Sequence, residues 1–430
     1  MTTGLLWLRS DLRLVDHEPL RQLASTCDRL LLLYCIDPRL FEATPWGFSR
    51  MGIHRARFLI QTLEALRAEL RDHGSELVIR VGAPLEVIPQ LAAEYRVDVV
   101  AFHLEAAIDE RQEEMLLQRR LASHVRLCTA WGHTLVPLEQ LPFKLEALPK
   151  SFTPFRKKVE ASASCPLPSE APSSLPPAPS RLSPGALPTL EQFGLENKPL
   201  DARVLNSFRG GCQSARQQLH AYVWEYDRLR SYKETRNGML VPEDSTKISP
   251  WLALGSLTPR EVHQEIIKYE ETRISNESTY WLKFELLWRD YFRFVTHQGG
   301  ARLFRLSGLR ERDKDWHWSA ELFERWCEGK TGCSIVDACM IELSASGFLS
   351  NRGRQIVASY LVNDLNLDWR AGAAWFEYQL IDYDPCSNYG NWNYLAGVGN
   401  DPRTSRYFDP QKQAERYDPK GEYQRHWLRP

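Results

Sequence analysis

The chain has 430 residues, of which 43% are hydrophobic and 25% charged, and its formal charges nearly cancel at −1. This composition is typical of a globular protein and excludes wholesale disorder, while the length predicts two or three domains. The near-zero charge argues against a nonspecific polycation but allows a local basic patch. One feature is unusual: 14 residues are Trp, and ten of them follow residue 250.

Neither a membrane segment nor a disulfide framework is expected. No apolar run reaches the ~18 residues needed to span a bilayer, and the short run at 5–8 is followed directly by charged residues, unlike a signal peptide. Nine Cys without a C-x-x-C pair predict reduced thiols, and therefore a cytoplasmic protein. Three Cys recur every six residues, at 327, 333 and 339, which does not match zinc-ligand spacing, so no metal site is predicted.

Residues 1–131 are predicted to form an α/β domain with a parallel five-stranded sheet. Five short runs rich in Leu, Val and Ile are typical of strands buried on both faces. These runs lie at 4–8, 30–36, 77–81, 97–102 and 125–128. The helical stretches at 50–72 and 84–95 are long enough for right-handed crossovers. Neither a G-x-G-x-x-G fingerprint nor a P-loop is present.

The rest of the chain is predicted to hold a linker and a large all-helical domain. We expect the inter-domain linker at 132–200, because eight Pro fall within 166–188. The helical domain is expected at 201–430, where apolar residues recur at three- and four-residue spacing. The clearest helical stretches are 280–294, 321–326, 353–365 and 369–380.

Three segments of the helical region have the chemistry of a ligand site. Three hydroxyls and Lys247 precede a predicted helix start with Ser249 as N-cap, which suits a phosphate or simple capping. Glu285, Trp288 and Arg289 share one helix face, which suits either a cavity for a flat polar ligand or a solvated ion pair beside a core Trp. Residues 389–394 mix Gly, Asn and aromatics without helical period and are predicted to be a ligand-contacting loop.

Motifs along the whole chain then resemble those of one family. They begin at 7–13 (WLRSDLR) and include 351–355 (NRGRQ), 364–370, 382–388 and 390–392 (GNW). In order and spacing, these resemble the photolyase/cryptochrome family. Residues 151–157 (SFTPFRK) and 232–240 (YKETRNGML), together with Tyr394 in place of a second Trp, resemble its DASH cryptochrome branch.

The resemblance implies an N-terminal antenna domain and a C-terminal domain that holds FAD, with Asn388 near the reactive flavin nitrogen and Arg354 paired with Asp382. The residues implied to bind FAD are Tyr232, Ser245, Thr246, Lys247, Ile248, Ser249, Arg289, Asn351, Arg354, Asp382, Asp384 and Asn388.

The resemblance also gives the Trp excess a meaning. Trp392, Trp369 and Trp316 match positions that conduct electrons from the surface to the flavin, and Trp318 is a close rival to Trp316. For any single Trp, core packing is the usual role. We keep that interpretation for Trp251, Trp326 and Trp375.

The implied activity is blue-light repair of cyclobutane pyrimidine dimers, with an electron passing from excited reduced FAD to a flipped-out lesion. Trp288 and Tyr394 would flank the lesion, and Glu285 would hydrogen-bond it or donate a proton to it. Arg236 and Arg352 would contact the DNA backbone. Damaged DNA, preferentially single-stranded, is the expected partner, and we expect a monomer.

The alternative is a blue-light sensory photoreceptor. We expect no long C-terminal signalling segment, which makes the photoreceptor hypothesis weaker than the repair hypothesis. A third alternative, a nucleotide-binding scaffold without photochemistry, would be excluded if the purified protein is yellow. Methenyltetrahydrofolate is the expected antenna pigment, bound near Glu110, although Glu105 and Glu113 are close rivals for that position.

Overall fold

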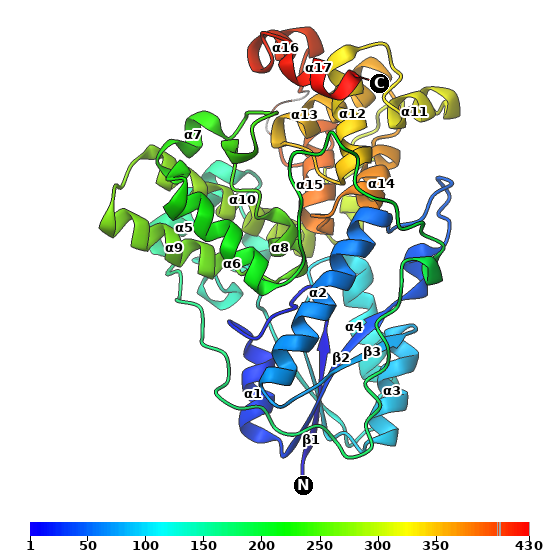
Figure 1. Cartoon of the computed structure of the whole chain (residues 1–430), viewed down its shortest axis with the longest axis vertical. Helices are drawn as coiled ribbons and strands as arrows, with labels where there is room; N and C mark the ends of the chain where they lie inside the picture. The colour runs from blue at the N-terminus through cyan, green and yellow to red at the C-terminus, as the bar shows by residue number, and fades with distance from the viewer. Residues whose placement is uncertain (402, 404–405, 430) are drawn as a thin grey trace.

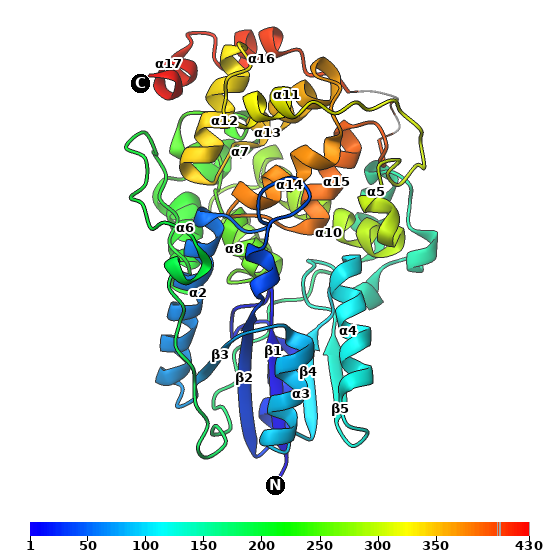
Figure 2. The same cartoon turned by 90° about the vertical axis from the view of Figure 1, so that its right-hand side faces the viewer.

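The computed structural model describes residues 1–401, 403 and 406–429. Its N-terminal part is a five-stranded, wholly parallel sheet with the order β3-β2-β1-β4-β5 (Figures 1 and 2). The strands are β1 (Thr3–Leu8), β2 (Arg29–Ile36), β3 (Leu77–Val81), β4 (Val99–His103) and β5 (Arg126–Ala130). The predicted α/β fold is therefore confirmed. Most strand ends lie one or two residues from their predicted positions.

Helices cover both faces of this sheet, which explains why the strands are apolar throughout. Alternate β1 side chains point to opposite faces. Leu6 and Leu8 pack with α1 (Glu18–Thr26) and α2 (Ile53–Asp72). Leu5 and Trp7 pack on the other face, with α3 (Pro84–Glu94) and α4 (Ile108–Arg120).

The C-terminal part is helical, as predicted. Its helices are α6 (Cys212–His220), α7 (Tyr232–Thr235), α8 (Ser249–Leu254), α9 (Pro259–Thr272), α10 (Glu277–Gly299), α11 (Ala320–Cys327), α12 (Ser334–Ser346), α13 (Asn351–Ser359), α14 (Trp369–Gln379), α15 (Pro385–Leu395), α16 (Pro410–Tyr417) and α17 (Glu422–Leu428). Within the described residues, no helix is both long and apolar enough to cross a membrane.

The segment expected to be a linker is only partly one. Its residues Phe152–Ser162 form α5, whose buried Phe152, Phe155 and Val159 pack into the helical core beside Tyr291 of α10. From 163 to 200 the chain runs along the α/β domain (Figure 1). There the carbonyls of Pro177 and Pro184 accept hydrogen bonds from backbone N–H groups of β2 and β3.

Two local predictions were wrong. Residues 389–394 are not a loop but part of α15, which begins after the N-cap Asp384 and has Pro385 in its first turn. The N-cap and close packing outweigh the low helix propensity of this Gly- and Asn-rich segment. The helix packs so closely on Phe292 that a Cβ on Gly390 would lie 2.3 Å from its ring. Ser249 is not an N-cap either, because it is the first residue of α8 and its hydroxyl is used elsewhere.

Candidate functional site

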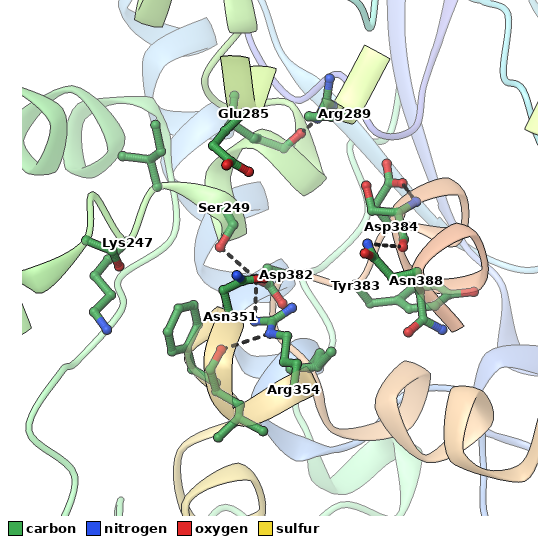
Figure 3. A pocket seen from close by; sticks show the side chains of 18 of the residues that line it. Lys247, Ser249, Glu285, Arg289, Asn351, Arg354, Asp382, Tyr383, Asp384 and Asn388 are labelled. Carbon is green, nitrogen blue, oxygen red and sulfur yellow. Dashed lines mark hydrogen bonds and ion pairs between the residues drawn. The ribbon is translucent and has the colours of Figure 1, made fainter. Parts of the chain in front are cut away.

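A large cavity opens among α7, α8, α10, α13, α14 and α15 of the helical domain (Figure 3). It encloses about 1330 Å³, including the part open to solvent. All twelve residues predicted to bind FAD line it, although they come from sequence positions 232 to 388. Glu285, Arg236 and Trp392 line it as well, whereas Trp288, Tyr394, Trp369, Trp316, Arg352 and Glu110 do not.

Asp382 lies at the centre of a buried hydrogen-bond network on one wall. Its Oδ2 accepts from the Ser249 hydroxyl at 2.6 Å and from the Arg354 guanidinium at 2.7 Å, so the predicted Arg354–Asp382 pair is present (Figure 3). Arg354 is also held by the Leu349 carbonyl at 2.8 Å. These bonds fix the carboxylate at the junction of α8, α13 and the segment before α15.

Two buried oxygens of the wall have no hydrogen-bond partner among the residues that the structure describes. They are Asp382 Oδ1 and Gln355 Oε1, which lie in residues lining the cavity. A buried acceptor without a donor costs ~1–3 kcal/mol. The imide N–H and ribityl hydroxyls of FAD are donors that could satisfy such acceptors, so the residues present fit this cofactor.

Asp384 connects the cavity to the domain interface. Its carboxylate accepts from Arg293 at 2.6 Å and from the Ser387 N–H at 2.7 Å, and Arg293 also lies 3.2 Å from Glu105 of the α/β domain. Burial alone would raise the pKa of Asp384, but the Arg293 and Arg289 guanidiniums outweigh it and the pKa is lowered. A fixed negative charge therefore lies at the edge of the cavity.

Arg289 and Asn388 are held by backbone carbonyls. Arg289 donates to the carbonyls of His133 and Leu252, and burial, with Arg293 nearby, lowers its pKa to about 10. The Asn388 side-chain amide donates to the Ala373 carbonyl at 3.0 Å. Both side chains are thus oriented before any ligand enters.

Lys247 differs from the expectation of a phosphate-binding lysine. Its backbone is left-handed, with φ of 56°, and its ammonium lies 5.0 Å from the Phe348 ring centroid. Burial lowers the pKa of Lys247, while Glu342 opposes this shift. In Figure 3 its side chain points away from Asp382.

Glu285 and Arg236 form an ion pair at the cavity. Glu285 comes from the middle of α10, while Arg236 directly follows α7. Sequence reasoning assigned Glu285 to the lesion and Arg236 to the DNA backbone, and it did not predict that they would pair. Each side chain remains partly exposed, so solvent and a ligand can reach the pair.

Trp288 and Tyr394 lie beside one another, next to this cavity. Their rings are T-shaped at 6.1 Å, and Trp288 also stacks on Phe152 at 3.8 Å. Arg406 donates to the Tyr394 hydroxyl and lies 4.3 Å over its ring. The two aromatics predicted to flank a lesion are therefore neighbours, and both are held in place by other side chains.

Arg352 lies on the first turn of α13, outside the cavity. Its guanidinium lies 4.3 Å over the Tyr417 ring and donates to Asn237 and Gln413, each at 3.3 Å. Burial lowers its pKa. The side chain is thus oriented on the same side of the domain as Asn237, the neighbour of Arg236.

The three predicted electron carriers differ in their surroundings. Trp392 lines the cavity, and Trp369 is buried and donates its indole N–H to the Leu306 carbonyl at 3.1 Å. Trp316 has the Lys314 ammonium 4.8 Å from its ring centroid. In the described part of the chain, the ring contacts of Trp392 are with Phe376 and Trp326, not with Trp369.

Sequence reasoning missed several lining residues. Gln355, Ser387 and Asn391 supply polar groups, and Leu282 and Leu286 supply apolar wall. The two Leu could have been found, because they lie on the same α10 face as Glu285 and Arg289. No local signal marks Gln355, since its importance depends on the missing partner for its buried oxygen.

A second cavity lies between the two domains and encloses about 1710 Å³, including open solvent. Glu105, Glu110 and Glu113 all line it. Glu105 pairs with Arg293 and Glu113 with Arg39, whereas Glu110 has no ion pair among the described residues. Burial, with Glu105 nearby, raises the pKa of Glu110 to about 7.

Asp11, His17 and His103 form a buried cluster whose possible metal-ligand atoms lie within 4.8 Å of one another. His17 Nδ1 accepts from the Leu20 N–H at 3.2 Å, which puts its proton on Nε2, 3.0 Å from the Asp11 carboxylate. His103 Nδ1 lies 2.7 Å from the same carboxylate. A protonated ring nitrogen has no lone pair for a metal. His17 is thereby excluded as a metal ligand, while the Nε2 atom of His103 has no hydrogen-bond partner among the described residues.

Comparison with known proteins agrees with this architecture. Residues 4–177 match the family model described as DNA photolyase, and residues 281–430 match the FAD binding domain of DNA photolyase. The chain is 50% identical to a cryptochrome DASH of Gloeobacter violaceus, over 99% of this chain and 85% of the relative. It is 47% identical to the chloroplastic/mitochondrial cryptochrome DASH of Arabidopsis thaliana, over 99% and 75%.

The fold comparison gives the same result. A cryptochrome crystal structure from Synechocystis sp. superposes with a TM-score of 0.96 at 46% identity, covering 100% of this chain and 89% of that one. Sequence, domain order and fold thus agree over the full length. The chain belongs to the cryptochrome DASH family, flavoproteins related to DNA photolyases with an FAD-binding helical domain.

Proposed function

We propose that this protein repairs cyclobutane pyrimidine dimers in DNA under blue light, with a preference for single-stranded DNA. The observation that supports this is that the Glu285–Arg236 pair and the twelve predicted FAD-binding residues line one cavity. The cavity thus combines a place for an electron donor with charged groups that can bind a damaged base and its phosphate.

FAD, bound in this cavity and reduced, would supply the light-driven electron that opens the dimer. The protein supplies binding, orientation and electrostatics. Asp382, Arg354 and Ser249 form one rigid wall, and Asp384 with Arg293 fixes charge on another. Because these groups are hydrogen-bonded already, little reorganisation is needed when the cavity fills.

The Glu285–Arg236 pair gives the DNA-binding step a clear chemistry. A phosphate can take over the Arg236 guanidinium through charge-assisted hydrogen bonds, which releases Glu285 to bind the lesion. Trp288 lies one helix turn after Glu285 on α10, and Tyr394 lies at the end of α15. A flipped base could contact both rings there. In single-stranded DNA, flipping requires no base pair to be broken, which favours that substrate.

The test is repair of a single thymine dimer in a short oligonucleotide. The protein is first reduced chemically and then illuminated, and restored thymine is quantified by chromatography. We expect Glu285→Gln to lower repair by about 10- to 100-fold, equivalent to a charge-assisted hydrogen bond of ~1.5–3 kcal/mol. Glu277→Gln is the matched control, since Glu277 is an exposed, Lys233-paired residue of the same helix.

Unrepaired dimers under blue light with wild-type protein carrying fully reduced FAD would contradict the proposal. Repair that survives Glu285→Gln at the level of Glu277→Gln would contradict the role of Glu285. Comparing single- and double-stranded oligonucleotides tests the substrate preference, and sedimentation of the same sample tests the expected monomer.

We also propose that methenyltetrahydrofolate binds in the inter-domain cavity as an antenna, near Glu110. Among the three rival acids, Glu110 is the one without an ion pair in the described chain, and its raised pKa lets it donate as well as accept. Glu110→Gln should reduce folate binding measured by fluorescence. Glu113→Gln, whose carboxylate is engaged by Arg39, is the control. Equal binding by both variants would remove Glu110 from the site.

A further inference from the structure

A second line of aromatic rings leads from Trp392 to the surface. Trp326 of α11 lies 6.5 Å from Trp392 in a T-shaped contact. Phe323 stacks on Trp326 at 5.9 Å and 24°, and Trp318 lies 5.2 Å from Phe323. Trp318 is 48% exposed. Ring contacts are therefore continuous from the cavity to solvent along this line.

The line ends on a pair of indoles. Trp46, from the loop before α2, lies 5.3 Å from Trp318. A positive charge on Trp318 can therefore be shared with a second electron-rich ring, and its indole proton can leave to water. Both effects favour Trp318 as the last electron donor of a chain.

Electrostatics favours this line over its counterpart through Trp316. The Lys314 ammonium lies 4.8 Å from the Trp316 ring, and a cation next to an indole opposes the loss of an electron from it. The Trp316 indole nitrogen is also buried, and within the described part of the chain no acceptor is in reach of its proton. By contrast, the Trp326 N–H donates to the Val357 carbonyl at 3.1 Å, which stabilises positive charge on that ring.

We infer that Trp326 and Trp318 form a second electron path to Trp392, with Phe323 bridging them. The inference rests on the proposed light-driven function. When the cavity holds light-excited, oxidised FAD as electron acceptor, Trp392 loses one electron to it. Trp326 then reduces the oxidised Trp392, and Trp318 reduces the oxidised Trp326. Oxidised Trp318 releases its indole proton to water and regains a hydrogen atom from a thiol, which becomes a thiyl radical. Two such radicals, from two turnovers, combine to a disulfide.

The first experiment compares photoreduction in FAD-loaded variants under anaerobic blue light with a thiol. Trp392→Phe should be the slowest single variant, since both paths end on Trp392. Trp369→Phe should retain measurable photoreduction, and adding Trp326→Phe should slow it at least about tenfold further. The inference is overturned if Trp369→Phe alone is as slow as Trp392→Phe, or if the double variant matches Trp369→Phe.

A second variant guards against loss of folding, because Trp326 is fully buried. Trp318→Phe lies at the exposed end, and in the Trp369→Phe background it should slow photoreduction to the same extent as Trp326→Phe. Equal rates with and without Trp318→Phe would overturn the inference. Flavin content and thermal stability of every variant show that the fold is kept.

Chemical trapping gives a readout that does not depend on activity. After illumination in air without thiol, the Trp318 radical adds dioxygen, and mass spectrometry locates the oxidised indole. We expect oxidation at Trp318 and Trp46, lost in Trp326→Phe, and its confinement to Trp316 would overturn the inference. Dimer repair by chemically reduced protein needs neither path, so its absence would count against the proposed function instead.

Discussion

Asp384→Asn tests the electrostatic link between the two domains. Asp384 and Arg293 are 6% and 2% exposed and lie 2.6 Å apart. Asn keeps the N-cap of α15, since Asn and Asp cap equally well, so the substitution removes only the charge. Removing one member of a buried pair costs ~3–5 kcal/mol. Because Glu105 still faces Arg293 at 3.2 Å, we expect about 3 kcal/mol, at the lower end of that range.

The assay is thermal unfolding at fixed protein concentration and fixed FAD loading. At ~2–4 °C per kcal/mol for a domain of this size, the Tm should fall by about 6–12 °C. Asp201→Asn is the control, because its pair with Arg203 is partly exposed and should contribute at most ~1 kcal/mol. A Tm decrease no larger than that of Asp201→Asn would refute the reasoning.

The same variant has a defined pH dependence. The pKa of Asp384 is lowered in the folded protein, so its contribution is present at neutral pH and is lost as the pH falls through that lowered value. Wild type and Asp384→Asn should therefore converge in stability in acid. A difference that stays constant down to strongly acidic pH would mean that the charge of Asp384 is not responsible.

Three further predictions concern other parts of the helical domain. Burial raises the pKa of Glu342 to about 7, so the folded state loses stability as the pH rises from about 5 to 8. Glu342→Gln, which can still accept from Tyr423, should remove that decline in pH-dependent denaturation. Gly372→Ala should destabilise by ~1–3 kcal/mol in urea unfolding and slow photoreduction, because its Cβ would lie 2.3 Å from the Trp392 ring. Unchanged stability and photoreduction would show that the ring moves aside without cost. Arg352→Gln should lower the salt dependence of single-stranded DNA binding by ~0.7 in the log–log slope, and an unchanged slope would exclude a phosphate contact.

The α/β domain was the most predictable part of the chain. Its strands are buried on both faces, so each appears in the sequence as a continuous apolar run such as 30–36. Helical periodicity located α10 at 280–294, but the helix extends three residues further at its start and five at its end, and it begins at a capping box in which Asn276 and Thr279 bond each other's backbone. Local physics determines these features, and a single sequence carries it.

Features that depend on contacts distant in sequence were not predictable in the same way. Helix α15 has a low helix propensity, and its Gly390 allows close packing against Phe292, a contact that is distant in sequence. Helix α5 was not predicted within the expected linker, because its apolar face packs against Tyr291, about 140 residues later in the chain.

The site shows the same division. The resemblance brought its residues together as a list, but the pairing of Glu285 with Arg236 and the unpartnered Gln355 oxygen required the fold. Trp326 was assigned to core packing from sequence, and only its contact with Trp392 suggested another role.

The proline-rich run from 163 to 200 affects the tendency of the protein to aggregate through its sheet edge. Strand β3 lies at one edge of the sheet, and exposed strand edges are where foreign strands add and aggregation begins. The Pro184 carbonyl occupies the outward N–H of Ile79 at 2.8 Å, and the prolines themselves have no N–H to offer to a newcomer. This stretch thus closes the sheet edge to strand addition, so cleavage within it should increase aggregation while both domains remain folded.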